Sequence, residues 1–331
     1  MSLVGIIANP SAGKDIRRLV AHGRLVPNHE KVNVIRRVLL ALDAVGVSHA
    51  VIMPDASALG SQALEEAQLE MAVDILDMPV FGDENDSTRA AELMVQMGAG
   101  CLVTLGGDGT NRVVAKGSGQ VPLVPISTGT NNVFPAMVEG TTTGLAAGLV
   151  AMGRVDMAKV CITCKRLEVY VDGALKDIAL IDLAVSKERA VAARAIWNVD
   201  TIHEVFLCRA EPSSIGLSSI GAWLHPVSAA DPSGIYLRLG PGGATVLAAV
   251  APGTVQPVPI TEWRVLSIGE RVEVLRKPCT IALDGERQFT VRSDQRVEVA
   301  VSDRGPRVVA IDAALLEAAR MGVFVDSRWN A

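Results

Sequence analysis

The stretch Leu102-Val103-Thr104-Leu105-Gly106-Gly107-Asp108-Gly109-Thr110 decides the fold of this chain. An apolar run ends abruptly in two glycines, an acid, a third glycine and a hydroxyl. Glycines let backbone N–H groups approach phosphates closely, and ligands of open α/β sheets bind at the carboxyl ends of parallel strands. Residues 106–110 are therefore either a phosphate-binding turn or a plain strand-to-helix turn. In the first case Asp108 is a candidate for holding Mg²⁺ or for accepting a hydroxyl proton.

Apolar runs typical of buried strands alternate with helical patterns through the first half of the chain. This alternation is typical of βαβ units that feed a mostly parallel sheet. The expected strands are residues 3–8, 50–53, 73–76, 101–105 and 121–125, and the expected helices are residues 32–45, 61–71 and 87–97.

Beyond about residue 155, β-rich segments follow one another with short turns, which favours a largely antiparallel second domain. The expected strands there are residues 157–162, 166–171, 175–185, 235–239, 245–250, 271–275, 280–283, 287–291 and 296–301. A last helical pattern covers residues 313–321. We therefore expect an α/β Rossmann-like nucleotide-binding domain at 1–153, a β-rich, sandwich-like substrate domain at 154–305, and a C-terminal helical segment at 306–331 that packs back on the first domain.

The composition limits the classes of protein. The chain has 331 residues, 49% hydrophobic and 20% charged, with a net charge of −5, which excludes an intrinsically disordered protein. No block of Lys or Arg attracts nucleic acid or an anionic membrane, and no apolar run reaches the roughly 18 residues of a membrane span. The start of the chain lacks a secretory signal, and the five cysteines are an odd number, so we expect a cytoplasmic protein.

Several strings resemble one superfamily of kinases. The sequence GGDGT after an apolar strand resembles the nucleotide-binding motif of NAD kinases, diacylglycerol kinases and sphingosine-type lipid kinases. Asn9-Pro10-Ser11-Ala12-Gly13-Lys14 resembles the NPxxGK turn of that superfamily, and residues 125–132 resemble the glycine-rich stretch of its lipid-kinase branch. Arg154-Val155-Asp156 and Asp284-Gly285-Glu286 resemble the crossover and the late DGE of that branch. The whole pattern most resembles the acetoin catabolism protein X group of NAD-kinase-like proteins.

Three positions depart from the patterns of the better-known kinases. Arg112 lies where the lipid-kinase branch has its x-Asn-Glu string, and Asn132 replaces an Asp of that branch. Ile181 stands where NAD kinases carry an Asn that grips the dinucleotide, so NAD is expected to be a poor acceptor. The loops around Gly216 and Gly242 look small and polar, which favours a soluble small-molecule acceptor over a lipid.

The resemblance implies a kinase with a cleft between two domains, using ATP and Mg²⁺ to phosphorylate a hydroxyl. It implies Asp108 as metal ligand or base, Glu286 as a second catalytic carboxylate, and Asp182 and Asp284 at the substrate. The residues implied at the nucleotide are Asn9, Lys14, Gly106, Gly107, Gly109, Thr110, Thr128, Gly129, Thr130 and Asn131. A homo-oligomer is expected. The alternative is a non-catalytic nucleotide or dinucleotide sensor with the same fold.

Overall fold

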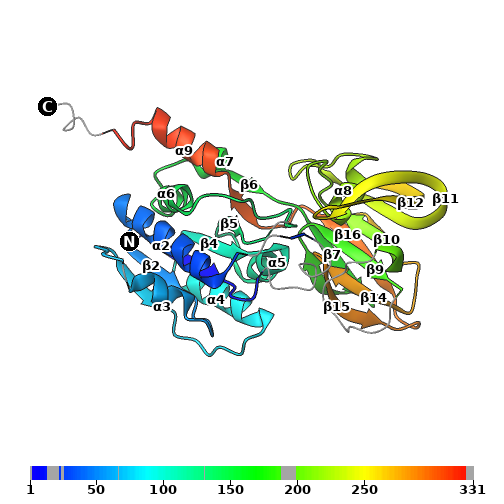
Figure 1. Ribbon diagram of the computed structural model, residues 1–331, viewed down its shortest axis with the longest axis horizontal. Coiled ribbons are helices and arrows are strands. Elements are labelled where there is room, and N and C mark those ends of the chain that lie inside the picture. Colours follow the sequence, from blue (N-terminus) through cyan, green and yellow to red (C-terminus); the bar gives the residue numbers. More distant parts are fainter. Residues whose placement is uncertain are drawn as a thin grey trace.

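The computed structural model describes residues 2–12, 22–23, 26–65, 67–129, 131–187 and 199–325 (Figure 1). An α/β part, with helices around one sheet, adjoins a β-rich part at the other end of the molecule. The predicted order, an α/β part followed by a β-rich part with antiparallel sheets, is confirmed. Among the described residues, no helix has the length and apolar character needed to cross a membrane.

The α/β part is built on a seven-stranded sheet in the order β3-β2-β1-β4-β5-β17-β6. All neighbours pair in parallel except β6, which runs antiparallel to β17. The strands are β1 (Leu3–Ala8), β2 (His49–Ile52), β3 (Ala72–Ile75), β4 (Cys101–Gly106), β5 (Leu123–Ser127), β6 (Cys161–Thr163) and β17 (Arg307–Val309). The sheet thus takes in β6, beyond the expected division at residue 153, and it takes β17 from the end of the chain.

Helices cover both faces of this sheet because successive strand residues point to opposite sides. In β1, Val4 and Ile6 pack into the core under α2, α3, α6 and α9, whereas Leu3 and Ile7 pack into the core under α4 and α5. The helices are α2 (Asn28–Ala44), α3 (Leu59–Leu64), α4 (Glu84–Gln96), α5 (Asp108–Gly117), α6 (Gly140–Ala151), α7 (Met157–Val160) and α9 (Ile311–Arg320).

The β-rich part contains two antiparallel sheets that share one core. The larger has the order β12-β11-β10-β9-β14-β15 and the smaller the order β13-β16-β7-β8. Phe206 of the larger sheet and Val299 of the smaller lie in the shared core, and the opposite face of the larger sheet packs under α8 (Leu217–Ala222). The strands are β7 (Arg166–Val171), β8 (Ala174–Ala179), β9 (Asp182–Ser186), β10 (Ile202–Leu207), β11 (Ser233–Ala251), β12 (Thr254–Ser267), β13 (Arg271–Glu273), β14 (Cys279–Leu283), β15 (Glu286–Val291) and β16 (Val297–Ser302); the short 3-10 helix η1 covers Val199–Thr201.

Four of the expected strands differ from the structure. The strand expected at 157–162 is wrong in its first half, because the Asp156 carboxylate accepts the Ala158 N–H and caps the helix α7. The strand expected at 175–185 is broken between β8 and β9. The strands expected at 235–239 and 245–250 are parts of one long, irregular strand, β11.

The helix α6 was missed because its glycines are poor helix formers. Gly140, Gly144 and Gly148 lie four residues apart and face α2 or the turn after it. A Cβ on Gly144 would come within 2.5 Å of the Val38 carbonyl oxygen, so glycine is required for the two helices to approach this closely. The same residues that weaken the helix pattern therefore permit its packing.

Candidate functional site

Strand β4 ends in the turn that begins α5, and the glycines of this turn are needed for packing. A Cβ on Gly106 would lie 2.4–2.6 Å from the atoms of the Thr110 side chain, and one on Gly107 would lie 2.8 Å from Asn132 Oδ1. A Cβ on Gly109 would lie 3.4 Å from the Glu286 carboxyl group. Glycine is therefore required for the close contacts at the start of α5, and the N-terminus of a helix is a place where anions bind.

The turn after β1 is joined to this helix. Asn9 Nδ2 donates to Thr110 Oγ1 at 3.0 Å, which brings together two of the residues predicted at the nucleotide. Lys31 of α2, fully buried, donates from Nζ to the carbonyl oxygens of Asn9, Pro10 and Ala12 at 3.0–3.1 Å. Sequence reasoning missed Lys31. The available signal was a lysine on the same helix face as the apolar residues of α2.

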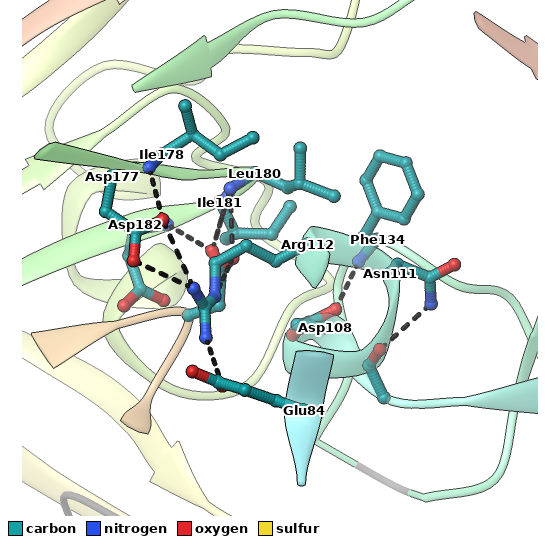
Figure 2. Close-up of polar contacts among 12 residues, drawn as sticks. Glu84, Asp108, Asn111, Arg112, Phe134, Asp177, Ile178, Leu180, Ile181 and Asp182 are labelled. Carbon is teal, nitrogen blue, oxygen red and sulfur yellow. Dashed lines mark hydrogen bonds and ion pairs between the residues drawn. The ribbon is translucent and has the colours of Figure 1, made fainter. Parts of the chain in front are cut away.

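Asp108 is held by the loop that follows β5. Its carboxylate accepts the backbone N–H group of Phe134 at 2.8 Å (Figure 2). It also accepts the backbone N–H group of Val133 at 3.0 and 3.1 Å, and Asp108 is buried, at 9% exposure. Asp108 therefore anchors this loop to the start of α5.

The loop after β5 also carries other residues predicted at the nucleotide. The Thr128 N–H donates to the Gly106 carbonyl at 3.2 Å, and the Gly129 carbonyl accepts from Ser127 Oγ at 2.8 Å. The Thr128 hydroxyl is buried and makes no hydrogen bond within the described part of the chain, so it is a polar group to which a ligand could bond. Lys14 and Thr130, also predicted at the nucleotide, lie outside the described residues.

A cavity of about 50 Å³ lies between the two parts of the chain. Asp108 and Asn131 line it from the α/β part, and Asp182 and Asp284 line it from the β-rich part. The structure thus brings together both residues predicted at the substrate and Asp108. Glu286 lies beside them, at Gly109.

Asp284 lies in the turn between β14 and β15, where its φ of 50° and the φ of 78° at Gly285 are typical of a tight hairpin turn. Its buried carboxylate accepts the backbone N–H groups of Leu180 and Ile181 at 2.8–3.0 Å. The N–H groups of residues 180 and 181 thus bond to a side chain and not to a neighbouring strand, which explains the break between β8 and β9. Burial, with the neighbouring Asp182 charge, raises the pKa of Asp284 well above its ordinary value, although Arg112 opposes this shift.

Arg112 connects the two parts of the molecule. Its side chain is fully buried and forms ion pairs with Glu84 on α4 (3.1 Å), Asp177 on β8 (3.3 Å) and Asp284 (3.9 Å). Figure 2 shows the guanidinium between Glu84 and Asp177. Lys116, one turn further along α5, also pairs with Asp177 at 2.7 Å. The residue that departs from the lipid-kinase string is therefore the centre of an ion-pair network between the two parts.

Ile181 has a packing role. Its side chain is fully buried with Phe134, Cys164 and Leu180, and it is not among the residues that line the cavity. A polar side chain at this position would be buried in an apolar cluster rather than offered to a dinucleotide.

Two carboxylates at the cavity are candidate ligands for Mg²⁺. The described residues contain no cluster of three or more His, Cys, Asp or Glu side chains arranged for a metal ion. Magnesium in phosphoryl-transfer sites usually binds one or two carboxylates, phosphate oxygens and water. The carboxylates of Asp108 and Asp182 at the cavity fit that requirement.

Comparison with known proteins gives matches over both parts of the chain. Residues 4–155 match the ATP-NAD kinase N-terminal domain, and residues 165–304 match the Acetoin catabolism protein X C-terminal domain. The Acetoin catabolism protein X of Cupriavidus necator is 38% identical over 332 residues, which cover 96% of this chain and 92% of the relative. The similarity thus includes both sides of the cavity.

Proposed function

The chain belongs to the acetoin catabolism protein X family, which has an NAD-kinase-like N-terminal domain, and on that premise we propose that it is a phosphotransferase. It transfers the γ-phosphoryl group of ATP to the hydroxyl of a small molecule. One observation supports the proposal: the Glu286 carboxyl group, from the β-rich part, lies against Gly109 in the first turn of α5, next in sequence to Asp108, which lines the cavity. The proposal includes a cytoplasmic, homo-oligomeric enzyme.

The chemistry requires phosphate binding, charge neutralisation and a proton acceptor. The bare backbone of Gly106, Gly107 and Gly109, with Asn9 and the Thr128 hydroxyl, would bind the phosphates. Mg²⁺, held by Asp108 with phosphate oxygens, would neutralise their charge.

The acceptor oxygen forms a bond to phosphorus as the bond from phosphorus to the ADP oxygen breaks. The hydroxyl proton passes to a carboxylate, for which Glu286 is the first candidate and Asp108 the second. Asp284 positions the backbone at 180–182 and so shapes the acceptor side of the cavity.

The test is ATP turnover by the full chain with Mg²⁺ and a panel of alcohols, diols, sugars and NAD. Product formation is followed by ³¹P NMR, and Glu286→Gln should lower it about 10²-fold or more. Glu273→Gln, an exposed glutamate on β13, serves as the control and should have no effect. Undiminished turnover by Glu286→Gln would remove it as the base, and absence of any phosphorylated product would refute the kinase.

A nucleotide sensor is the second candidate, and the hydrogen bonds to Asp108 favour it. A carboxylate held by the Val133 and Phe134 amides can act as a purely structural anchor for the loop after β5. A sensor would bind ATP tightly and yield no phosphorylated product with any acceptor. The relative's name associates that protein with acetoin catabolism, and we propose the same metabolic setting for this chain under either function.

A further inference from the structure

The cavity between the two parts has walls of opposite chemistry. We infer that it is the acceptor subsite and that it takes the alkyl end of a short, uncharged hydroxy compound. The inference rests on the proposed function for the identity of the ligand as phosphoryl acceptor. One wall is formed by the acidic residues Asp108, Asp182 and Asp284, of which the Asp284 carboxylate is bonded to backbone N–H groups, and the other wall is formed by apolar residues of the β-rich part.

The apolar wall consists of Ile202 at the start of β10, Val250 near the end of β11, and Ile215 and Leu217 on either side of Gly216. The sequence led us to expect a small, polar surface around Gly216. The structure instead directs the apolar neighbours of this glycine to the cavity, so an acceptor meets hydrocarbon on this side.

The loop at Gly216 is fixed by hydrogen bonds. Gly216 has a φ of 98°, a conformation that favours glycine, and its N–H donates to the Ala249 carbonyl at 2.9 Å. Ser219 Oγ, which is buried, contacts the carbonyl oxygens of both Gly216 and Ala249 at 2.8 and 3.1 Å. The wall is therefore built into the fold and does not need a ligand to form.

The acidic lining favours an acceptor that donates a hydrogen bond. Asp108 and Asp182 line the cavity, and a neutral hydroxyl can donate to a carboxylate. A carboxylated acceptor would instead add negative charge beside these two residues. We therefore expect the part of the acceptor that enters the cavity to be uncharged.

The size of the cavity favours a small group. The cavity is about 50 Å³, compared with roughly 150 Å³ for an engineered apolar cavity that admits benzene. It therefore fits a hydroxyl carbon with one or two attached carbons. A secondary alcohol next to a methyl group satisfies both walls.

The experiment compares two four-carbon probes that differ in their ends. Butane-2,3-diol ends in methyl groups, and erythritol carries a hydroxyl on every carbon. Binding of each to the full chain without nucleotide is measured by saturation-transfer NMR. We expect the diol to bind about tenfold more tightly, because the apolar wall offers no partner to the extra hydroxyls.

The variant Val250→Thr keeps the side-chain shape and adds a hydroxyl to the apolar wall, so it should reduce the preference for the diol. The matched control is Val255→Thr, which changes an exposed valine of β12 in the same hairpin and should leave the preference unchanged. Equal or tighter binding of erythritol, failure of the diol to bind, or an unaltered preference in Val250→Thr would each overturn the inference. If the diol preference is found and no acceptor is phosphorylated by ATP, the subsite stands and the proposed kinase function fails.

Discussion

The Glu286 carboxyl group lies against Gly109, so close that a Cβ on this glycine would be 3.4 Å from the Glu286 carboxyl carbon. Gly109 directly follows Asp108, and Glu286 follows Asp284 by two residues. Two motifs that are far apart in the sequence therefore meet at the first turn of α5. The absence of a side chain at Gly109 leaves the surface between them open.

Replacing Gly109 by alanine should raise the stability of the protein slightly and lower its affinity for ATP. At 3.4 Å the new methyl group makes ordinary contact with Glu286, and alanine is better than glycine in a helix by roughly 0.5–1 kcal/mol, so the melting temperature should rise slightly. The methyl group would also cover backbone that phosphates approach, so ATP affinity should fall about tenfold or more. Calorimetric titration with ATP and a thermal melt measure both quantities. A raised melting temperature with unchanged ATP affinity would show that phosphates bind elsewhere.

Asp108→Asn should lose turnover by about 10²–10⁴-fold, as expected for a metal ligand or base. The structure adds a cost in stability on the order of 1 kcal/mol, because the carboxylate is buried and accepts backbone N–H groups of Val133 and Phe134.

Asp86→Asn is the matched control for that experiment. Asp86 is also buried in the first turn of a helix, α4, and its carboxylate accepts the N–H groups of Phe81 and Gly82. It does not line the cavity. Urea unfolding of both variants should show similar losses, and only Asp108→Asn should lose turnover. Equal turnover in the two variants would assign Asp108 a structural role alone.

The sequence predicted the features that depend on local patterns. One such feature is the turn at Gly106 and Asp108 after an apolar strand, and another is the alternation of strands and helices. The structure contains both. Lys31 and Arg112 were not predicted at the site, because their partners are tertiary. Lys31 contacts carbonyl groups of a distant turn, and the side chain of Arg112 is enclosed by acids from three other elements. Residue type alone assigns such cations to the surface.

The role of Asp284 could be predicted from the sequence only in part. The string Asp284-Gly285 indicated a turn, which the structure contains, but the bonds from Asp284 to the amides of residues 180–182 follow only from the pairing of β14 with β9. The same bonds explain why one long strand was expected where two exist. The periodicity of apolar residues in a sequence does not indicate which buried carboxylate will bind backbone N–H groups and so end a strand.

Arg112→Met should destabilise the protein by about 3–5 kcal/mol, because it removes a buried cation from the buried Asp284 and from the partly exposed Glu84 and Asp177. Lys159→Met is the matched control, since Lys159 pairs with Glu317 at 2.6 Å on the surface and its loss should change little. Denaturant unfolding measures both. A small loss in Arg112→Met would mean that Lys116 or water compensates within the network.

The pH dependence of stability should change in Asp284→Asn. Burial and Asp182 raise the pKa of Asp284 in the folded protein, so the folded state binds this proton more tightly than the unfolded chain does. The resulting stabilisation is fully present below the pKa of the unfolded carboxyl and is lost as pH rises through the higher pKa of the folded state. Asn does not titrate, so relative to the native protein the variant should be less stable at pH 5 than at pH 8.

Urea midpoints at pH 5, 6, 7 and 8 measure this difference, and the curves of the native protein and Asp284→Asn should converge as pH rises. Asp303→Asn, which changes an exposed aspartate after β16, should run parallel to the native curve. Asp284→Asn also loses stability because its hydrogen bonds to the amides of Leu180 and Ile181 are weaker, but this part of the loss is the same at each pH. Only the change of the urea midpoint with pH therefore reports the proton on Asp284. If the midpoints of the native protein and of Asp284→Asn changed with pH in parallel, burial would not hold the proton on Asp284.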